Sequence, residues 1–250
     1  MIVQKMRSKF LFGLMTIFAS LINTACASND VSELPEWKVS VSFPSLYPVN
    51  VTQAYGTNYE HSWNSPIHGF SQFMSKSKLE NVNKRFSDYD GYGVPIHTLT
   101  MLNGSQVSGL NTLPDTLYLS WTSITNTQFY ITKFSVSEDI KKEMSRKDHY
   151  IGRSGDEITC YRTEFVFGLL PNGNAKIWIK GCNSIVFLQE VPPFKVNSED
   201  SLGFDVADYK QRSYLGRIQK RAEDAGATLD PIPWDKVNKV YSNYEITELN

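Results

Sequence analysis

Several segments of the chain alternate between apolar and polar residues with a period of two, which is typical of strands that bury one face. The clearest are 37–43 (WKVSVSF), 116–121 (TLYLSW) and 130–136, and a shorter one lies at 49–51. Between 57 and 109 the alternation fades, which favours long connections with one or two short strands. We therefore predict a mainly β (α+β) fold, an antiparallel sheet or a β-sandwich with one C-terminal amphipathic helix and one short helix.

A glycine-bearing loop separates two strand-like runs, 164–170 and 175–180. A phosphate-binding loop needs several glycines and a helix after it, whereas a strand follows here. Asn-Gly accepts positive φ at both central positions of a two-residue hairpin turn, so we predict a hairpin with its turn at Asn172 and Gly173. This turn sets three facing pairs: Val166 with Ile179, Phe167 with Trp178, and Gly168 with Ile177.

Two helices are expected. The short one, 137–146, begins with a capping serine and an acidic first turn. The longer one, 205–225, has Asp205 as its cap and Gly226 at its end. Its apolar face carries Leu215, Ile218, Ala222 and Ala225. Its basic face, which we interpret as ordinary solvated surface, carries Arg212, Arg217, Lys220 and Arg221. After it, 231–234 (PIPW) forms a stiff connection whose tryptophan we expect to pack on the core.

The chain begins with a basic stretch and an apolar run from Phe10 to Ile22. This run is too short to span a bilayer, which takes about 20 residues, so we predict a secretory signal peptide over residues 1–25. The sequence 23–26 (NTAC) resembles a bacterial lipobox, with Asn23 where an aliphatic residue is usual. We expect Cys26 to be lipidated and residues 26–36 to form a tether; cleavage after Ala27 is the alternative.

The charge and composition limit the classes of partner. Loss of Lys5, Arg7 and Lys9 with the signal peptide changes the formal net charge from −1 to −4. A chain with no basic excess is not suited to neutralising phosphates, which argues against nucleic acid as a partner. Hydrophobic residues at 41% and aromatic residues at 13% indicate a folded chain, and we predict a single β-rich domain over 37–250.

If Cys26 carries lipid, Cys160 and Cys182 remain as an even pair in an oxidising compartment, which suggests a disulfide. In an ideal extension of the predicted hairpin, however, Cys160 lies opposite Ile185, three residues beyond Cys182. The two sulfur atoms then point to opposite faces and lie too far apart. A bulge, or a bend at Gly181, corrects this offset. From the sequence, the bonded and the unbonded forms of Cys160 and Cys182 are both compatible with the hairpin.

No catalytic motif emerges from the sequence. The stretch 152–155 (GRSG) lacks the spacing and context of a nucleophile elbow. The four histidines do not form H-E-x-x-H, and we expect them at the surface or in turns. They are His61, His68, His97 and His149. The stretch 87–93 (SDYDGYG) begins like a calcium loop, but its twelfth position is Leu99 instead of a carboxylate, so we interpret it as an exposed turn.

We therefore predict no catalytic residue, no cofactor and no metal. The alternative is a hydrolase with an unfamiliar site, for which Asp88, Asp90 and His97 are the first candidates.

Short pieces spread over the chain resemble a known family. They are Leu113-Pro114-Asp115 leading to Trp121, Phe129-Tyr130, the hairpin 168–173 with 177–179 and Gly181, Arg217-Ile218, and Pro233-Trp234-Asp235. Over roughly 37–241 the chain resembles the bacterial envelope lipoproteins of domain-of-unknown-function family 2931. Pro-Asn-Gly stands where that family has Pro-Gly-Gly, a change that the same turn accepts.

The resemblance implies a noncatalytic, lipid-anchored protein of the bacterial cell envelope. Some members are associated with toxin–immunity loci of the type VI secretion system, beside lipase-like effectors, which implies an immunity protein that binds such a lipase. The position after Cys26 is Ala27 and not aspartate, so we expect the outer membrane, facing the periplasm, with a soluble periplasmic form as the alternative. An envelope-maintenance or small-ligand-binding lipoprotein is the other interpretation. The resemblance supplies no catalytic and no partner-binding residues.

Overall fold

The computed structural model describes residues 34–70 and 75–249, which belong to one compact unit. The predicted signal peptide (1–25), Cys26 and the tether up to residue 33 lie outside the described residues. Leu34 already packs against the hydrophobic core. Within the described ranges, no helix combines the length and the apolar character needed to cross a membrane.

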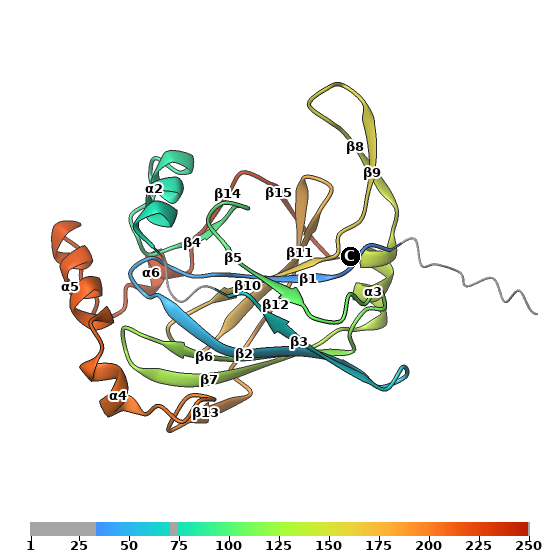
Figure 1. The fold of residues 1–250 in the computed structure, drawn as a ribbon. Coiled ribbons are helices and arrows are strands. Elements are labelled where there is room, and N and C mark those ends of the chain that lie inside the picture. The colour runs from blue at the N-terminus through green and yellow to red at the C-terminus, as the bar shows by residue number, and fades with distance from the viewer. Residues whose placement is uncertain (1–33, 71–74, 250) are drawn as a thin grey trace, which may run out of the picture. The chain divides into compact units, whose positions relative to one another are not determined.

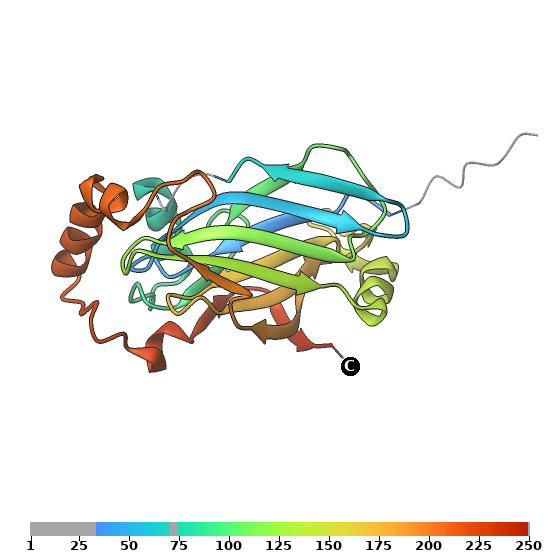
Figure 2. The ribbon, with the colours of Figure 1, turned by 90° about the horizontal axis from the view of Figure 1, so that it is seen from below.

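Eleven of the strands in the described residues join into one sheet, in the order β13-β7-β6-β2-β3-β5-β1-β10-β11-β12-β15 (Figures 1 and 2). These strands are β1 (Lys38–Ser42), β2 (Val49–Asn58), β3 (Trp63–His68), β5 (Leu102–Gln106), β6 (Thr116–Ser123), β7 (Gln128–Ser135), β10 (Glu164–Leu169), β11 (Ala175–Gly181), β12 (Ser184–Val191), β13 (Lys195–Asn197) and β15 (Glu245–Glu248). Most neighbours are antiparallel; β1 with β10 and β12 with β15 are parallel pairs.

The two halves of this sheet pack face to face, with β7, β6 and β2 in one layer and β1, β10 and β11 in the other. The ring of Phe134 in β7 meets the rings of Phe165 and Phe167 in β10 edge-on, with centroids 6.2 and 6.1 Å apart. The alternating residues of the sequence fill this core: Trp37, Val39, Val41, Phe43, Leu117, Leu119 and Trp121. The prediction of a mainly β fold built on an antiparallel sheet or sandwich, with a few helices, is confirmed.

A second hydrophobic cluster covers the other face of β10 to β12. Val166, Trp178 and Ile185 project into it from the sheet. They are covered by the small parallel pair β4 (Val94–Ile96) and β14 (Val240–Ser242), and by α6 (Trp234–Val237). Because this sheet layer is buried on both faces, its strands are nearly continuous apolar runs.

The predicted register of the β10–β11 hairpin is wrong by one residue. The structure pairs Phe165 with Ile179, Val166 with Trp178, and Phe167 with Ile177. A two-residue turn would need an N–H from Pro171, which proline lacks. Instead Leu170 N donates to Asn174 O (2.9 Å) and Gly173 N to Leu170 O (2.9 Å), so the loop holds three residues. Pro171 occupies the second position of the turn, which its fixed φ favours, and Gly173 takes a φ of +93°.

Cys160 and Cys182 are joined by a disulfide, with Cα atoms 5.5 Å apart. The ideal ladder does not extend to these residues, because β10 begins only at Glu164 and Cys160 ends a separate strand, β9 (Glu157–Cys160), paired with β8 (Asp148–Ile151). Cys182 lies in the β11–β12 turn with a φ of +52°. At Gly181 a side chain would overlap the Tyr161 carbonyl oxygen, so the glycine permits the close approach of the two backbones.

Of the two predicted helices, one forms as expected and the other is broken. The short helix α3 (Glu138–Ser145) forms as expected, with Ser137 as its cap. The long helix is broken into α4 (Val206–Gln211) and α5 (Tyr214–Asp224). Arg212, between them, is extended, and its guanidinium stacks on the rings of Phe204 and Tyr209 at 4.4 and 4.6 Å. The break lets α4 bury Tyr209 and α5 bury Ile218 in different parts of the domain.

The region 57–109 is more regular than predicted, with β3, β4, β5 and a helix, α2 (Lys76–Arg85). Its sequence, KSKLENVNKR, offers few apolar residues, and Val82 is the one that is buried. Trp234 also departs from prediction. It begins α6 with 38% of its surface exposed, and Val237 is the α6 residue that enters the core.

Candidate functional site

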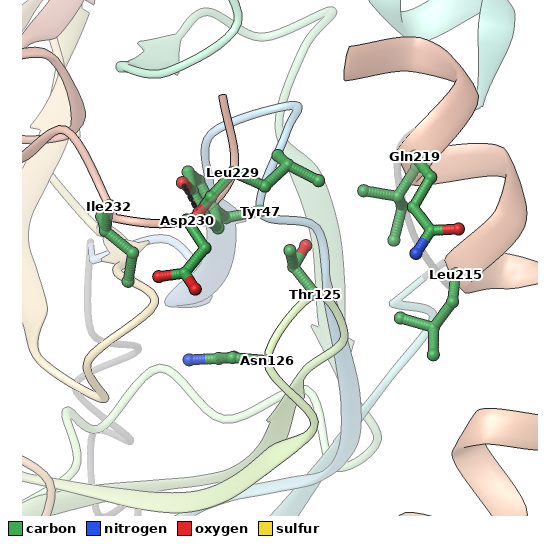
Figure 3. Close-up of a pocket in the computed structure, with 9 residues that line it drawn as sticks. Tyr47, Thr125, Asn126, Leu215, Gln219, Leu229, Asp230 and Ile232 are labelled. Carbon is green, nitrogen blue, oxygen red and sulfur yellow. Dashed lines mark hydrogen bonds between the residues drawn. The ribbon is translucent and has the colours of Figure 1, made fainter. Parts of the chain in front are cut away.

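A cleft of about 410 Å³ lies beside α5. Four separate parts of the chain line it: α5 with Leu215, Ile218 and Gln219; the segment after it with Leu229, Asp230 and Ile232; the β6–β7 turn with Thr125 and Asn126; and Tyr47 after β1. Figure 3 shows the α5 side chains along one side and Asp230 and Ile232 along the other, with Thr125 and Asn126 between them.

Hydrogen bonds to the backbone hold the walls of the cleft. The Tyr47 hydroxyl donates to Leu229 O (2.8 Å), and the Thr125 hydroxyl donates to Leu46 O (2.9 Å). Burial, together with the nearby Tyr92 and Asp230, raises the pKa of Tyr47 to about 12. The phenol therefore stays neutral and keeps its donated hydrogen bond at physiological pH. These contacts form the cleft before any ligand arrives, which lowers the entropic cost of binding.

The lining of the cleft is chiefly aliphatic. Leu215, Ile218, Leu229 and Ile232 supply the apolar surface. Asp230 is the one carboxylate among the described residues that line it, and Gln219 supplies an amide. Such a lining suits an aliphatic group that carries a cationic or hydrogen-bond-donating end. The cleft's titratable side chains among the described residues are the Asp230 carboxylate and the Tyr47 phenol, and the phenol already donates its proton to Leu229 O.

A second hollow, of about 430 Å³, lies on the other side of α5, facing α2. We call it the basic groove; its lining residues are Lys76, Leu79, Arg217, Lys220, Arg221, Asp224 and Ala225. Three of the four residues of the predicted basic face, Arg217, Lys220 and Arg221, therefore line a groove, whereas Arg212 stacks on aromatic rings outside it. Helix α5 is a ridge between an aliphatic cleft and a basic groove.

The three candidates for a hydrolase each make a separate local contact. Asp88 pairs with Lys239, at 3.1 Å between Oδ2 and Nζ. The Asp90 carboxylate accepts from Tyr92 N (3.1 Å). The His97 ring stacks near Tyr244, with centroids 6.1 Å apart, and burial followed by the charges of Arg85 and Lys180 lowers its pKa. None of these contacts joins two of the three candidates.

The stretch 87–93 is a structural turn. Gly91 has a φ of +91°, and Gly93 leaves room for the Tyr241 ring and the Lys239 carbonyl group. Leu99, at the twelfth position of the calcium-loop pattern, is 49% exposed. Over the described ranges, no three or more His, Cys, Asp or Glu side chains gather closely enough to hold a metal ion. Of the histidines, His149 lies in the β8–β9 hairpin, where its Nδ1 atom is 3.9 Å from Oε1 of Glu157.

Comparison with known families matches residues 23–235 to the model described as "Protein of unknown function (DUF2931)". The chain belongs to this family. No curated protein and no solved structure matches it. The residues that carried the DUF2931 resemblance in the sequence mostly build the fold. Tyr130 packs on Trp121, with ring centroids 4.9 Å apart, and its hydroxyl donates to Pro171 O (3.2 Å).

One of those DUF2931 residues, Ile218, also lines the cleft. Its burial and that of Ala222 follow from the predicted apolar face of the helix. The other lining residues were not predicted as a site. Tyr47, Asn126 and Asp230 come from distant segments, and no local motif connects them.

Proposed function

We propose that the chain is a noncatalytic lipoprotein of the cell envelope that binds a protein partner with the end of the domain that carries α5. The supporting observation is where this end lies. In both views α5 stands at one end of the domain, and the first described residues of the chain enter at the opposite end, near α3 (Figures 1 and 2).

The expected tether limits how far the domain can lie from the membrane. Residues 26–33 are eight residues, which reach at most roughly 28 Å when fully extended. A lipid on Cys26 would keep the first described residues within about this distance of the membrane. A tether of this kind raises the effective concentration of the binder near the surface that an incoming enzyme attacks.

The partner we propose is a lipase-like effector of the type VI secretion system, and the chain is its immunity protein. This assignment comes from the loci that the family resemblance implies. Binding needs no reaction by the chain itself, because a rigid sheet with a preformed ridge and two hollows is sufficient for recognition.

The test is co-expression of the full chain with the product of the gene next to its own, directed to the periplasm. We expect the two proteins to co-purify as a complex and the cells to survive a dose of the effector that kills cells without the chain. Survival without a complex, or a complex without protection, contradicts the immunity role. A matched strain carrying Cys26→Ser tests whether the lipid anchor contributes.

A small-ligand-binding lipoprotein is the second candidate, and the aliphatic cleft with its Asp230 carboxylate favours it. Hexylamine is a suitable probe because its chain fits the aliphatic lining and its ammonium group pairs with a carboxylate. Titration calorimetry should show binding to the wild type and loss of binding in Asp230→Asn. Equal binding to both proteins argues against the cleft as a ligand site.

A further inference from the structure

The basic groove concentrates positive charge on a protein that is otherwise acidic. Among the described residues that line it, four of seven are basic and one, Asp224, is a carboxylate, which pairs with Lys220 at 2.9 Å. Helices α2 and α5 lie side by side in both views (Figures 1 and 2). The groove therefore presents an excess of positive charge between two helices, although the mature chain as a whole is expected to carry a net negative charge.

The spacing along α5 forces these charges together. Arg217, Lys220 and Arg221 are three and four residues apart, so they share one face of the helix, and like charges at that spacing repel each other. Burial is the main cause that lowers the pKa of Arg221, and the charge of Arg217 lowers it further. An anion bound in the groove would relieve this repulsion.

Two of the cationic groups are held in place by contacts with the protein. Arg221 Nη1 donates to Ser45 O (2.8 Å), and the guanidinium of Arg217 lies 5.1 Å from the centre of the Tyr214 ring. A cation that is already oriented loses less conformational entropy when its partner arrives. Leu79 and Ala225 add apolar surface to the lining, and a lining of low polarity strengthens the field of the surrounding charges.

We propose that the basic groove between α2 and α5 binds an acidic segment of the partner protein, in which carboxylates pair with Lys76, Arg217 and Arg221. This inference rests on the proposed partner-binding function and adds to it the chemistry of the partner's surface. A protein is favoured over an anionic membrane because α5, which lines the groove, lies at the end of the domain opposite the first described residues (Figure 1).

The first test measures binding of a fluorescein-labelled hexaglutamate peptide by fluorescence anisotropy. The groove variant is Lys76→Glu/Arg217→Glu. The control, Lys142→Glu/Arg153→Glu, makes the same change in net charge at exposed positions in α3 and the β8–β9 turn. We expect the groove variant to bind at least about tenfold more weakly, and the control to stay within about twofold of the wild type. Equal weakening in both variants overturns the proposal, because it would reflect net charge alone.

Salt dependence and folding are checked with the same proteins. Affinity for the peptide should fall between about 0.05 M and about 0.5 M salt, since the Debye length shortens over this range. Far-ultraviolet circular dichroism should be unchanged in every variant. If the double glutamate variant does not fold, the neutral pair Lys76→Gln/Arg217→Gln replaces it, and the same loss of peptide binding is expected.

Two further measurements, binding of the effector and binding to lipid vesicles, distinguish failure of this inference from failure of the proposed function. If the effector complex forms equally well with the wild type and the groove variant, the inference fails while the proposed function stands. If the effector does not bind the wild type but the peptide binding is lost in the groove variant alone, the groove is supported and the immunity role fails. Binding to phosphatidylglycerol vesicles that the groove variant loses, without binding to the peptide, shows a membrane contact and overturns the proposal.

Discussion

The side chain of Asn126 donates a hydrogen bond from Nδ2 to the carbonyl oxygen of Pro171, over 2.7 Å. This bond joins a wall of the cleft, the β6–β7 turn, to the turn of the β10–β11 hairpin. The cleft and the most recognisable sequence motif of the chain are thus connected by one contact.

Asn126→Ala should lower the free energy of unfolding by about 1 kcal/mol, because a partly buried acceptor loses one of its donors while Tyr130 still donates to it. Urea denaturation monitored by tryptophan fluorescence measures the change. The control is Asn83→Ala on the exposed face of α2, which should be neutral or slightly stabilising. Equal destabilisation by the two substitutions would count against the contact.

Gly173→Ala should destabilise the hairpin by two separate effects. An alanine at a φ of +93° costs about 1–2 kcal/mol. Its methyl group would also lie 2.6 Å from two carbons of the Tyr130 ring, which forces the ring to move. Gly155→Ala is a matched control, because Gly155 has a φ of +89° and nothing within 4 Å of the added carbon. We expect the Gly173 variant to lose clearly more stability in chemical denaturation. Equal losses in the two variants would show that the clash with the Tyr130 ring adds nothing to the cost of the positive φ.

Reduction of the Cys160–Cys182 bond should lower the melting temperature. The bond closes a loop with a sequence separation of 22 residues, and loops of that size contribute about 3 kcal/mol through the unfolded state. Scanning calorimetry of the mature chain with and without reductant measures the shift. The variant Cys160→Ser/Cys182→Ser should melt at the temperature of the reduced protein, and its melting temperature should not change when reductant is added. A wild type that melts alike in both conditions contradicts the prediction.

The ion pair between Asp115 and Lys141 should make the free energy of unfolding depend on pH in the acid range. The Lys141 ammonium donates to Asp115 Oδ1 (2.6 Å), and this bond, together with one from Tyr59 N to Oδ2 (2.6 Å), lowers the pKa of Asp115 below its usual 3.8. A carboxyl whose pKa is lowered by folding adds stability above its unfolded pKa. That stability is lost as the pH falls from about 4 through the lower pKa of the folded state.

The variant Asp115→Asn should therefore be less stable at pH 7 by about 1 kcal/mol and lose less stability on acidification. Urea midpoints at pH 7, 4 and 3 measure both effects. Glu60→Gln, at an exposed turn, is the control and should keep the acid dependence of the wild type. An unchanged acid dependence in Asp115→Asn would show that other carboxylates cause it.

The sequence predicts those parts of the fold in which one periodicity persists. The strands around Trp121 and Phe134 follow from alternation alone, because each buries one face. The sequence predicts the hairpin at Asn172, but the Asn-Gly preference alone gives the wrong register, because Pro171 has no N–H for a two-residue turn. Helix α2 has no apolar periodicity in its sequence, because it buries a single residue, Val82. At the break, the Arg212 guanidinium stacks on the nearby rings of Phe204 and Tyr209, a contact that the apolar periodicity of the segment does not encode.

The cleft could be predicted only in part. The spacing of Leu215 and Ile218 marked an apolar face, and the structure places both side chains along the cleft. Asp230 and Tyr47 are more than 180 residues apart in the sequence and meet because the β1–β2 connection passes beside the segment after α5. Tertiary contacts of this range leave no local pattern in a single sequence.

Both edge strands of the eleven-stranded sheet are short. The first, β13, has three residues, carries Lys195 and follows two prolines, and the last, β15, has four residues with a glutamate at each end. Brief, charged borders offer little backbone for another molecule's strand to join, which limits edge-to-edge aggregation. Many copies of such a domain can be held close together and still remain separate folded molecules.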